Sequence, residues 1–308
     1  MTVEEFEQEW LNDKPYINAN TSGSTGTPKA IRLLKSDMKA SARATNTFFG
    51  LGHGSVFACP LNFDYIAAKM MFVRAQEAGG SVIAIPPSND FDISYKIDLL
   101  AVVPSQVECL LNHPHWASSI KNIIIGGAPL SDARAKSLLE SGYNCWQTYG
   151  MTETCSHVAL RALGENEYRA MPGVSLSIDN RKCMIINAPH LSGREFITND
   201  VVELSSDKSF VWQGRFDNVI NSGGIKIQAE ALEAKIRSLL NPQFEFYIVG
   251  RPDKKWGEAV AMVAETTTDN LAIVEEQLRN LLEHKFMPKY YEAVIEIPRT
   301  ANGKIKRL

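Results

Sequence analysis

The stretches LLAVVP (residues 99–104) and NIIIGG (residues 122–127) decide the fold class of this chain. Each is a short apolar run that ends in proline or glycine, which is typical of a strand buried on both faces of a sheet. Two further runs of this kind precede them, SVFACP (55–60) and SVIAIP (81–86). The four runs together predict a set of buried, parallel strands.

Longer segments separate these runs and are suited to helices. We expect helices within residues 36–49, 64–77, 105–112 and 131–141. Strands that alternate with helices predict an α/β fold, in which helices cover a parallel sheet.

The sequence changes character after residue 182. Short β-like pieces come first (KCMIIN, EFITND, SFVWQG and NVINSGG), and the strand-like runs FYIVG and AVAMVAE then alternate with two helical apolar faces. The first face is marked by Leu232, Ile236, Leu239 and Leu240, and the second by Leu271, Val274, Leu278, Leu281 and Leu282. We place the joint within GRFDN (214–218). This predicts a large layered α/β domain over residues 1–215 and a small α+β domain over residues 216–308.

The composition is that of a soluble globular protein, with 44% apolar and 22% charged residues. A net charge of -3 gives no reason to expect a nucleic acid or an anionic membrane as partner. No apolar run approaches the ~18–20 residues that span a bilayer, and MTVEEFEQEW is not a secretory signal. The five cysteines are far apart and form no C-x-x-C pair, so we expect reduced thiols in a cytoplasmic protein.

The strongest chemical signal is TSGSTGTPKAI at residues 21–31. Gly23 and Gly26 permit a tight loop whose backbone N–H groups face inward. Lys29 adds positive charge, and the hydroxyl groups of the loop belong to Thr21, Ser22, Ser24, Thr25 and Thr27. So many donors suit the β- and γ-phosphates of a nucleotide. The loop is not a Walker A motif, since Ala30 follows the lysine, and the competing interpretation is a flexible linker.

TSGSTGTPKAI resembles the phosphate-loop signature of the adenylate-forming superfamily, which includes acyl-CoA synthetases, luciferases and peptide-synthetase adenylation domains. Four further stretches match in the same order: GGAPL (126–130), YGMTET (149–154), TND (198–200) with GRFDNVINSGGIKI (214–227), and PRTANGKIKR (298–307). The resemblance implies ATP, Mg²⁺ and coenzyme A as cofactors, a small carboxylic acid as substrate, and a small domain that moves during the reaction.

The resemblance also implies a nucleotide site built from several of these stretches. Tyr149 offers an aromatic face for adenine, Asp200 and Arg215 match the positions that bind the ribose hydroxyls, and Lys226 matches a basic position near the phosphates. The glycine turn and the YGMTET stretch contribute Gly127, Ala128, Gly150, Met151 and Thr152. Taken singly, Tyr149 would suit a core aromatic residue, and Asp200 or Arg215 would suit a solvated surface charge.

The chemistry is expected at Lys304, Glu153 and Thr152. In the family, the lysine that corresponds to Lys304 bridges the attacking carboxylate and the α-phosphate, and its charge offsets the repulsion between two anions. Glu153 is a hard oxygen ligand and resembles the residue that binds Mg²⁺. Asp217 resembles the hinge residue of the family.

We expect coenzyme A to bind beside the glycine pair Gly223-Gly224. Gly223 and Gly224 would let its pantetheine arm come close to the backbone.

The acid is the harder question. YGMTETCSHVALR most resembles the o-succinylbenzoate–CoA ligase branch of the family, which belongs to menaquinone biosynthesis. This substrate carries two carboxylates, so the one that is not activated needs a cation, and Arg74 or Lys69 could supply it. We place Ser156 and His157 in the same acid pocket. The competing interpretation of Arg74 is an ordinary charge on an amphipathic helix.

Two alternatives from other classes remain open. Phe63-Asp64 resembles the pair with which amino-acid adenylation domains bind a substrate ammonium. The phosphate loop begins at residue 21, whereas family members carry a long segment before it. The expected N-terminal region is therefore shortened, which leaves room for a non-catalytic nucleotide-binding homologue, or for a homodimer that covers the exposed wall.

Overall fold

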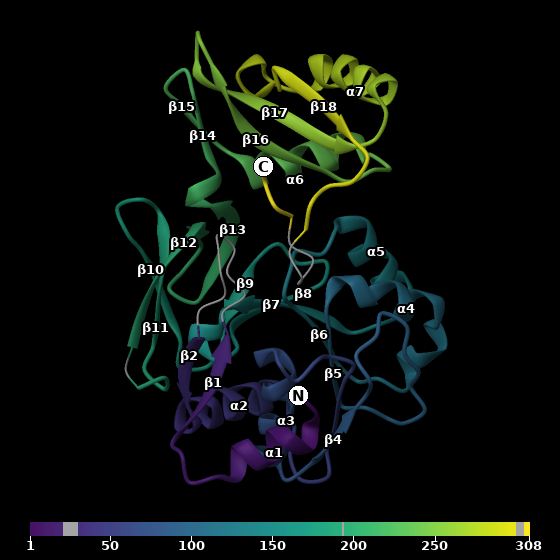
Figure 1. Cartoon of the computed structure of the whole chain (residues 1–308), viewed down its shortest axis with the longest axis vertical. Helices are drawn as coiled ribbons and strands as arrows, with labels where there is room; N and C mark the ends of the chain where they lie inside the picture. Colours follow the sequence, from purple (N-terminus) through teal and green to yellow (C-terminus); the bar gives the residue numbers. More distant parts are fainter. Residues whose placement is uncertain (21–29, 193, 300–304) are drawn as a thin grey trace. The chain divides into compact units, whose positions relative to one another are not determined.

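The computed structural model of this chain describes residues 1–20, 30–192, 194–299 and 305–308, and the chain divides into two compact units. The first unit contains Met1–Leu176, Ile186–Phe196 and Ser205–Phe210. The second contains Ser177–Ile185, Ile197–Leu204 and Val211–Leu308. The mixed α/β class is confirmed (Figure 1). The expected domain division after Arg215 and the expected mobility of the small domain stay predictions.

A parallel sheet forms the centre of the first unit. Its strands lie in the order β4 (Ser81–Ala84), β3 (Val56–Cys59), β5 (Leu99–Val102), β6 (Ile123–Ile125) and β7 (Cys145–Gly150). The sheet continues with two antiparallel strands, β8 (His157–Ala162) and β9 (Tyr168–Ala170). Each of the four apolar runs quoted above contains one of the parallel strands, so the strands are confirmed. The expected burial holds for β3, β5 and β6, whereas β4 is half-buried to exposed because it lies at the edge of the sheet.

The helices of the first unit are α1 (Val3–Leu11), α2 (Lys35–Phe49), α3 (Ile66–Ala78), α4 (Val107–Asn112) and α5 (Asp132–Glu140). The last four confirm the helices expected from the sequence. Both α2 and α3 end at a glycine in the left-handed conformation, Gly50 with a φ of 62° and Gly79 with a φ of 66°. A residue without a Cβ adopts this conformation freely, so these glycines end the two helices.

The core of the first unit covers both faces of the sheet. Leu100 and Val102 of β5 pack with Leu138 of α5 in one buried cluster. Side chains alternate between the faces of a strand, so the buried residues Leu99 and Ala101 point to the other face. Helix α3 packs against β3 and β5, and α2 packs against α3.

A separate antiparallel pair joins β1 (Tyr16–Asn20) to β2 (Ala30–Leu34), with Asn20 opposite Ala30. Residues 21–29 connect these strands and lie outside the described residues. Four more strands contribute residues to both units: β10 (Ser175–Ile178), β11 (Cys183–Ala188), β12 (Arg194–Leu204) and β13 (Ser209–Arg215). Short 3₁₀ turns occur at η1 (Pro104–Gln106), η2 (Pro114–Ser118), η3 (Thr152–Thr154), η4 (Phe216–Asn218) and η5 (His284–Phe286).

The second unit contains a five-stranded sheet and two longer helices. The strands are β14 (Val219–Ser222), β15 (Ile225–Gln228), β16 (Phe246–Asp253), β17 (Gly257–Glu265) and β18 (Tyr290–Val294). The helices are α6 (Ala229–Leu240) and α7 (Thr268–Leu281). Their core includes Leu232, Ile236, Leu271 and Leu278, which confirms the centre of each apolar face. Leu239 and Leu281, expected on the same faces, are exposed.

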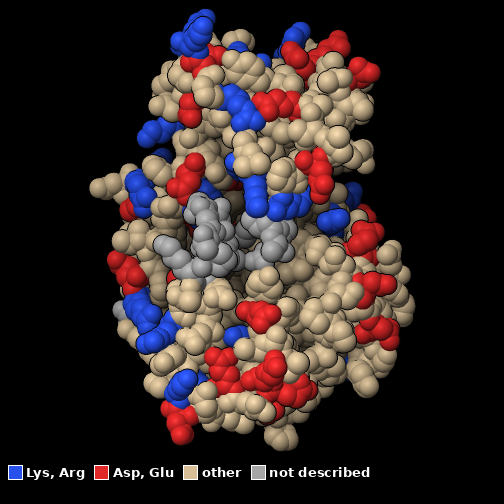
Figure 2. All heavy atoms as spheres, in the orientation of Figure 1, with Lys and Arg blue, Asp and Glu red and all other residues tan. Residues whose placement is uncertain are grey.

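The surface charges and the helices of the structure agree with the composition of a globular protein. Figure 2 shows lysine and arginine side chains interspersed with aspartate and glutamate over the face in view. Within the described residues, none of the helices is both long enough and apolar enough to cross a membrane. All five cysteines lie in the described part of the chain, and each is buried and free of a disulfide, as expected.

Candidate functional site

Two motifs lie together where the parallel strands β6 and β7 end. Ile125, the last residue of β6, pairs with Gln147 of β7, so the GGAPL turn begins beside the strand that leads into YGMTET. A Cβ on Gly126 would lie 2.4 Å from Oγ1 of Thr148, and Gly127 has a φ of 88°. Both positions therefore require glycine. The carboxyl ends of parallel strands are where open α/β sheets bind ligands.

Tyr149 has a fixed ring at this edge of the sheet. The ring lies edge-on to Phe210 with 5.1 Å between centroids, and it also meets Tyr168 at 5.9 Å. The side chain is half-buried, so it belongs neither to the closed core nor to the open surface. A rigid, partly exposed aromatic ring suits the stacking role that was predicted for it.

A strained turn follows the TET stretch. Thr152 and Thr154 are buried, while Glu153 between them is exposed. Cys155 has a φ of 62° and a ψ of −37°, and the Ser156 N–H donates to the Thr154 carbonyl at 2.7 Å. This is a γ-turn with a positive φ at a residue other than glycine, a conformation that costs energy. The turn directs Glu153 outward and brings Ser156 and His157 inward.

Arg74 of α3 is buried without an acidic partner. Its side chain is 1% exposed, one terminal nitrogen donates to the Ser156 hydroxyl, and the other lies 3.5 Å from the Met71 sulfur. Within the described residues, no carboxylate forms an ion pair with Arg74, and its Nε has no hydrogen-bond partner. Burial lowers the pKa of Arg74 to about 9, so the guanidinium is still charged at neutral pH.

A line of polar side chains extends from Arg74 to α2. The Ser156 hydroxyl lies 3.4 Å from Nδ1 of His157, and Nε2 of His157 lies 3.0 Å from the Thr45 hydroxyl. Burial, together with the charge of Arg74, places the pKa of His157 well below its ordinary value. The imidazole is therefore neutral at pH 7.

Lys69 is buried on the same helix but has different neighbours. Its Nζ lies 3.7 Å from the Glu9 carboxylate and donates to the Asn18 carbonyl at 3.2 Å. Residues five apart on a helix do not share a face. The structure thus brings Arg74, Ser156 and His157 together, whereas Lys69 lies beside Glu9 and Asn18.

The ribose-binding candidates are close together within the second unit. Arg215 lies 3.7 Å from Asp200 and donates to Asp217 at 2.7 Å. The Trp212 indole N–H also donates to Asp200 at 3.2 Å. Asn199 donates to both carboxylate oxygens of Asp217, at 3.2 and 3.3 Å. Asp217, the expected hinge residue, therefore accepts hydrogen bonds from both Asn199 and Arg215.

The glycine pair expected to meet coenzyme A lies between β14 and β15. A Cβ on Gly223 would lie 2.5 Å from the Trp256 ring, whereas a Cβ on Gly224 would meet no atom within 4 Å. Both glycines have positive φ values, 59° and 82°. Lys226 follows on β15 with an exposed side chain.

Several predicted residues lie outside the described residues: Thr21, Ser22, Gly23, Ser24, Thr25, Gly26, Thr27, Lys29 and Lys304. The described residues on either side of 300–304 pair with each other. Arg299 and Ile305 form an antiparallel bridge, and the Lys306 N–H donates to the Pro298 carbonyl at 2.8 Å.

Arg307 connects this terminal segment to α6. It donates to both oxygens of Glu233, lies 3.5 Å from Glu230 and donates to the Ile248 carbonyl at 2.7 Å. The sequence analysis assigned no role to Arg307 or to Thr45. The PRTANGKIKR match includes Arg307, but no pattern in the sequence singles out Thr45.

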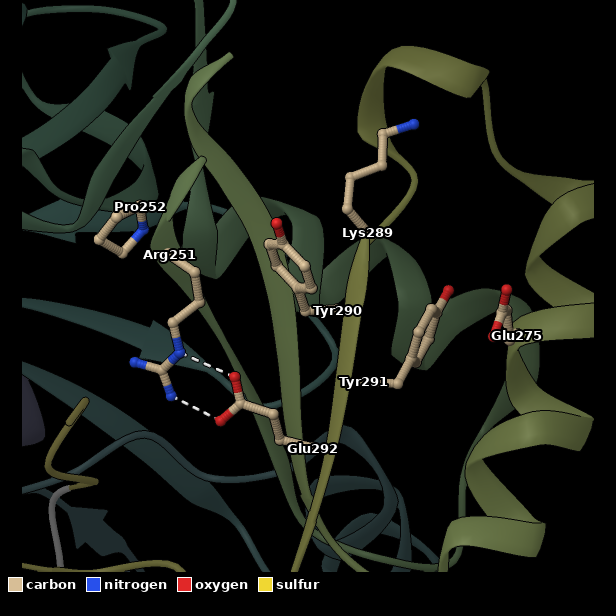
Figure 3. A pocket seen from close by; sticks show the side chains of 7 residues that line it. All are labelled: Arg251, Pro252, Glu275, Lys289, Tyr290, Tyr291 and Glu292. Carbon is tan, nitrogen blue, oxygen red and sulfur yellow. Dashed lines mark hydrogen bonds and ion pairs between the residues drawn. The ribbon is translucent and has the colours of Figure 1, made fainter. Parts of the chain in front are cut away.

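A shallow pocket of about 600 Å³ lies in the second unit, and its described lining includes none of the predicted site residues (Figure 3). Of the two cationic residues that line it, Arg251 and Lys289, Arg251 forms two hydrogen bonds with Glu292 at 2.8 and 2.7 Å and donates to the Leu308 carbonyl at 2.7 Å. This guanidinium is already neutralised, so we do not assign the substrate site there.

Comparisons with known proteins define the class. The sequence profile of the family described as AMP-binding enzyme matches residues 5–194, so the chain belongs to this family. Among solved structures, an acyl-CoA synthetase (AMP-forming)/AMP-acid ligase II-like protein from Dyadobacter fermentans is similar. It is 31% identical with a TM-score of 0.65, and the match covers 98% of this chain and 91% of that one.

Curated relatives are more distant and longer. An indoleacetate–CoA ligase of Aromatoleum aromaticum is 25% identical over 95% of this chain and 66% of its own. A 2-succinylbenzoate–CoA ligase of Listeria monocytogenes is 27% identical over 93% of this chain and 68% of its own. The chain thus spans about two thirds of the length of these relatives.

Proposed function

We propose that this chain is an AMP-forming acid–thiol ligase that converts o-succinylbenzoate to o-succinylbenzoyl-CoA. The observation that carries the substrate assignment is Arg74, a guanidinium that is 1% exposed and has no carboxylate partner among the described residues. A buried charge without a counter-ion is costly for the fold, and it is retained where a ligand supplies the missing charge. A second carboxylate on the substrate would do so.

The chemistry of such a ligase needs no nucleophilic side chain. The substrate carboxylate attacks the α-phosphorus of ATP, and pyrophosphate leaves. The thiolate of coenzyme A then attacks the acyl carbon, and AMP leaves. The protein contributes positioning and charge, for which we propose Lys304 at the α-phosphate, Thr152 near the phosphates, and Asp200 with Arg215 at the ribose.

The remaining predicted residues fit the same scheme. The phosphate-loop residues and Lys226 would contact phosphates, and Tyr149 would stack on adenine with Gly127 and Ala128 alongside. Asp217 would act as the hinge between the two half-reactions, and the Gly223-Gly224 pair would admit the pantetheine arm.

Glu153 fits a magnesium ion that is bound mainly by the nucleotide. It is exposed, and within the described residues no group of three or more His, Cys, Asp or Glu side chains could bind a metal by itself. Mg²⁺ commonly takes one or two protein carboxylates and completes its shell with phosphate oxygens and water. When bound, the ion neutralises charge on the phosphates.

The other acids have less support. An indoleacetate-like substrate carries one carboxylate and would leave Arg74 without an anion. For an amino acid, the expected ammonium partner Asp64 is exposed and pairs with the Met1 amino group at 3.1 Å. Phe63 belongs to a buried aromatic cluster, with 6.1 Å between its ring centroid and that of Phe6. The cytoplasmic location and the homodimer stay predictions.

Pyrophosphate release across a panel of acids tests the proposal. The panel contains o-succinylbenzoate, benzoate, indoleacetate, a fatty acid and free amino acids, each with and without coenzyme A. We expect the highest kcat/KM with o-succinylbenzoate. If another acid releases pyrophosphate and this one does not, the class stands and the substrate assignment is wrong. If none of the acids does, a non-catalytic homologue becomes the better interpretation.

A half-reaction assay tests Lys304. Lys304→Ala should slow adenylate formation by at least ~10²-fold, the order expected for a lost preorganised charge. Thioester formation from supplied acyl-AMP should continue. Equal loss of both steps would show that Lys304 acts through the fold and not through the chemistry.

A further inference from the structure

We infer that Thr45 and His157 are positioning residues that orient the Arg74 guanidinium through Ser156 and thereby set the preference for an acid with a second carboxylate. This inference rests on the proposed function, in which Arg74 binds that carboxylate. The four residues come from three elements: Thr45 from α2, Arg74 from α3, and Ser156 with His157 from the turn into β8.

The hydrogen-bond directions along this line are determined by the chemistry of its ends. Arg74 can only donate, so the Ser156 oxygen accepts from it. The Ser156 hydroxyl hydrogen can then point to Nδ1 of His157, 3.4 Å away. At the other end, Thr45 donates to the Ser41 carbonyl at 3.2 Å, so its oxygen must accept from Nε2–H of His157 at 3.0 Å.

These directions require one form of His157. Nδ1 must accept and Nε2 must carry the proton, which describes a neutral imidazole in a single tautomer. The imidazolium form would present N–H groups at both ends, and the Ser156 hydroxyl would lose its acceptor. His157 is 7% exposed, and the positive charge of Arg74 lies nearby. Both conditions favour the neutral imidazole. The Ser156 hydroxyl, Nε2–H of His157 and the Thr45 hydroxyl therefore each have an acceptor.

The same part of α2 also fixes the backbone that carries Arg74. The side-chain amide of Asn46, next to Thr45 in the chain, donates to the Arg74 carbonyl at 2.9 Å. One end of the guanidinium is fixed by Ser156, while its Nε has no partner within the described residues. An arginine with a fixed plane and an unused N–H is prepared for a planar carboxylate.

The line should therefore affect which acid binds and leave the reaction itself unchanged. None of its members bears on the carboxylate that attacks ATP. Loss of the line should raise the KM for a dicarboxylic acid and change kcat little. A monocarboxylic acid such as benzoate does not need Arg74, so its KM should stay the same.

Thr45→Val tests the inference, because valine keeps the branched shape and removes the hydroxyl. We expect the kcat/KM ratio of o-succinylbenzoate to benzoate to fall about tenfold, the order by which outer hydrogen-bond partners alter binding by a ligand-contacting group. Thr45→Ser, which keeps the hydroxyl, should restore the ratio. His157→Asn, which keeps an acceptor near the Nδ1 position but loses the link to Thr45, should lower the ratio as Thr45→Val does.

Tyr143→Phe is the matched control. It also removes one buried hydroxyl from the first unit, where Tyr143 donates to the Leu110 and His113 carbonyls at 3.1 and 2.7 Å. The ratio should be unchanged in this variant. If the wild type prefers o-succinylbenzoate and neither Thr45→Val nor His157→Asn lowers the preference, the inference is overturned. If the wild type shows no such preference, the substrate proposal is wrong instead.

Discussion

Arg74 in the first unit and Arg307 in the second are both largely buried, and the two have opposite surroundings. Arg74 in the first unit is 1% exposed and donates to a serine hydroxyl, with no carboxylate partner among the described residues. Arg307 in the second unit has a side chain that is 16% exposed. It donates to both oxygens of Glu233 and lies 3.5 Å from Glu230.

The pKa values of the two arginines move in opposite directions for this reason. Burial lowers the pKa of Arg74 to about 9. Burial acts on Arg307 in the same sense, but hydrogen bonds and charge from Glu233, with the charge of Glu230, raise its pKa overall. Burial also raises the pKa of Glu233, despite its partner. In the second unit, the attraction between Arg307 and its carboxylate partners opposes the cost of desolvation, whereas no carboxylate partner among the described residues opposes it at Arg74.

The comparison distinguishes a charge that the fold itself neutralises from one that it leaves for a ligand. The fold of the second unit supplies every partner that Arg307 needs, so its charge is explained without a ligand. The fold of the first unit leaves Arg74 without a carboxylate partner among the described residues, and we propose that the substrate supplies the missing anion. The two arginines should therefore respond differently to the same substitution.

The largest effect is expected for Arg307→Met. Removal of one partner of a buried pair leaves the other charge uncompensated, which costs about 3–5 kcal/mol. Native-state hydrogen exchange of the α6 amides would measure this as a lower free energy of opening. The double variant Arg307→Met with Glu233→Met should recover most of it. A loss below about 1 kcal/mol, the range of an exposed pair, would show that Arg307 is not structural.

The next effect is expected for Arg74→Met and concerns the substrate. A charge-assisted guanidinium–carboxylate contact is worth about 1.5–3 kcal/mol, so the KM for o-succinylbenzoate should rise roughly ten- to a hundredfold. Steady-state pyrophosphate release would measure it, with benzoate as the reference acid.

Lys69→Met is the matched comparison on the same helix. Lys69 already pairs with Glu9 at 3.7 Å, so its removal should lower stability without a selective change in the KM for the dicarboxylic acid. An increase in KM for Lys69→Met, but not for Arg74→Met, would move the carboxylate site to Lys69.

The smallest effect is a pH dependence at His157. Its pKa in the folded chain lies well below the ordinary value of 6.5, so the unfolded chain binds the proton first as the pH falls. Stability should be lost as the pH drops below 6.5, by about 1.4 kcal/mol per pH unit from this residue. Urea unfolding at pH 7, 6 and 5 should show a correspondingly weaker pH dependence in His157→Gln. Equal slopes in both proteins would mean that His157 is not held neutral.

The sequence predicted the parts of the fold that have a local cause. The apolar runs ending in proline or glycine correspond to the strands β3, β4, β5 and β6, because such runs favour strands inside a sheet that helices cover. Burial was predicted correctly for β3, β5 and β6, but β4 lies at the edge of the sheet and is half-buried to exposed. Helix faces were less exact. Leu239 and Leu281 were expected with the buried leucines of α6 and α7, but they are 39% and 47% exposed. Both lie in the last turn of their helices, beyond the last buried residues within those helices, Ile236 and Leu278.

The candidate site needed contacts that no local pattern encodes. Arg74 and Lys69 have the same charge on one helix, and only the packing of α1 gives Lys69 its partner Glu9. The bond between Thr45 and His157 joins residues 112 positions apart. It depends on α2 lying against the turn into β8, and that turn depends on the positive φ of Cys155. The role of the glycines was easier to predict from the sequence. At Gly126 the backbone approaches Thr148 closely, and Gly127 has a positive φ, and both are conformations that glycine permits.

The most direct test of the central claim is the unfolding of wild type and Arg74→Met with and without o-succinylbenzoate. Without the acid, the variant should be as stable as the wild type or more stable, because a buried charge without a counter-ion has been removed. Acid at a hundred times its Kd should stabilise the wild type by about 2.7 kcal/mol and the variant far less. A variant that is several kcal/mol less stable without acid, and is still protected fully by it, would show that Arg74 serves the fold and not the substrate.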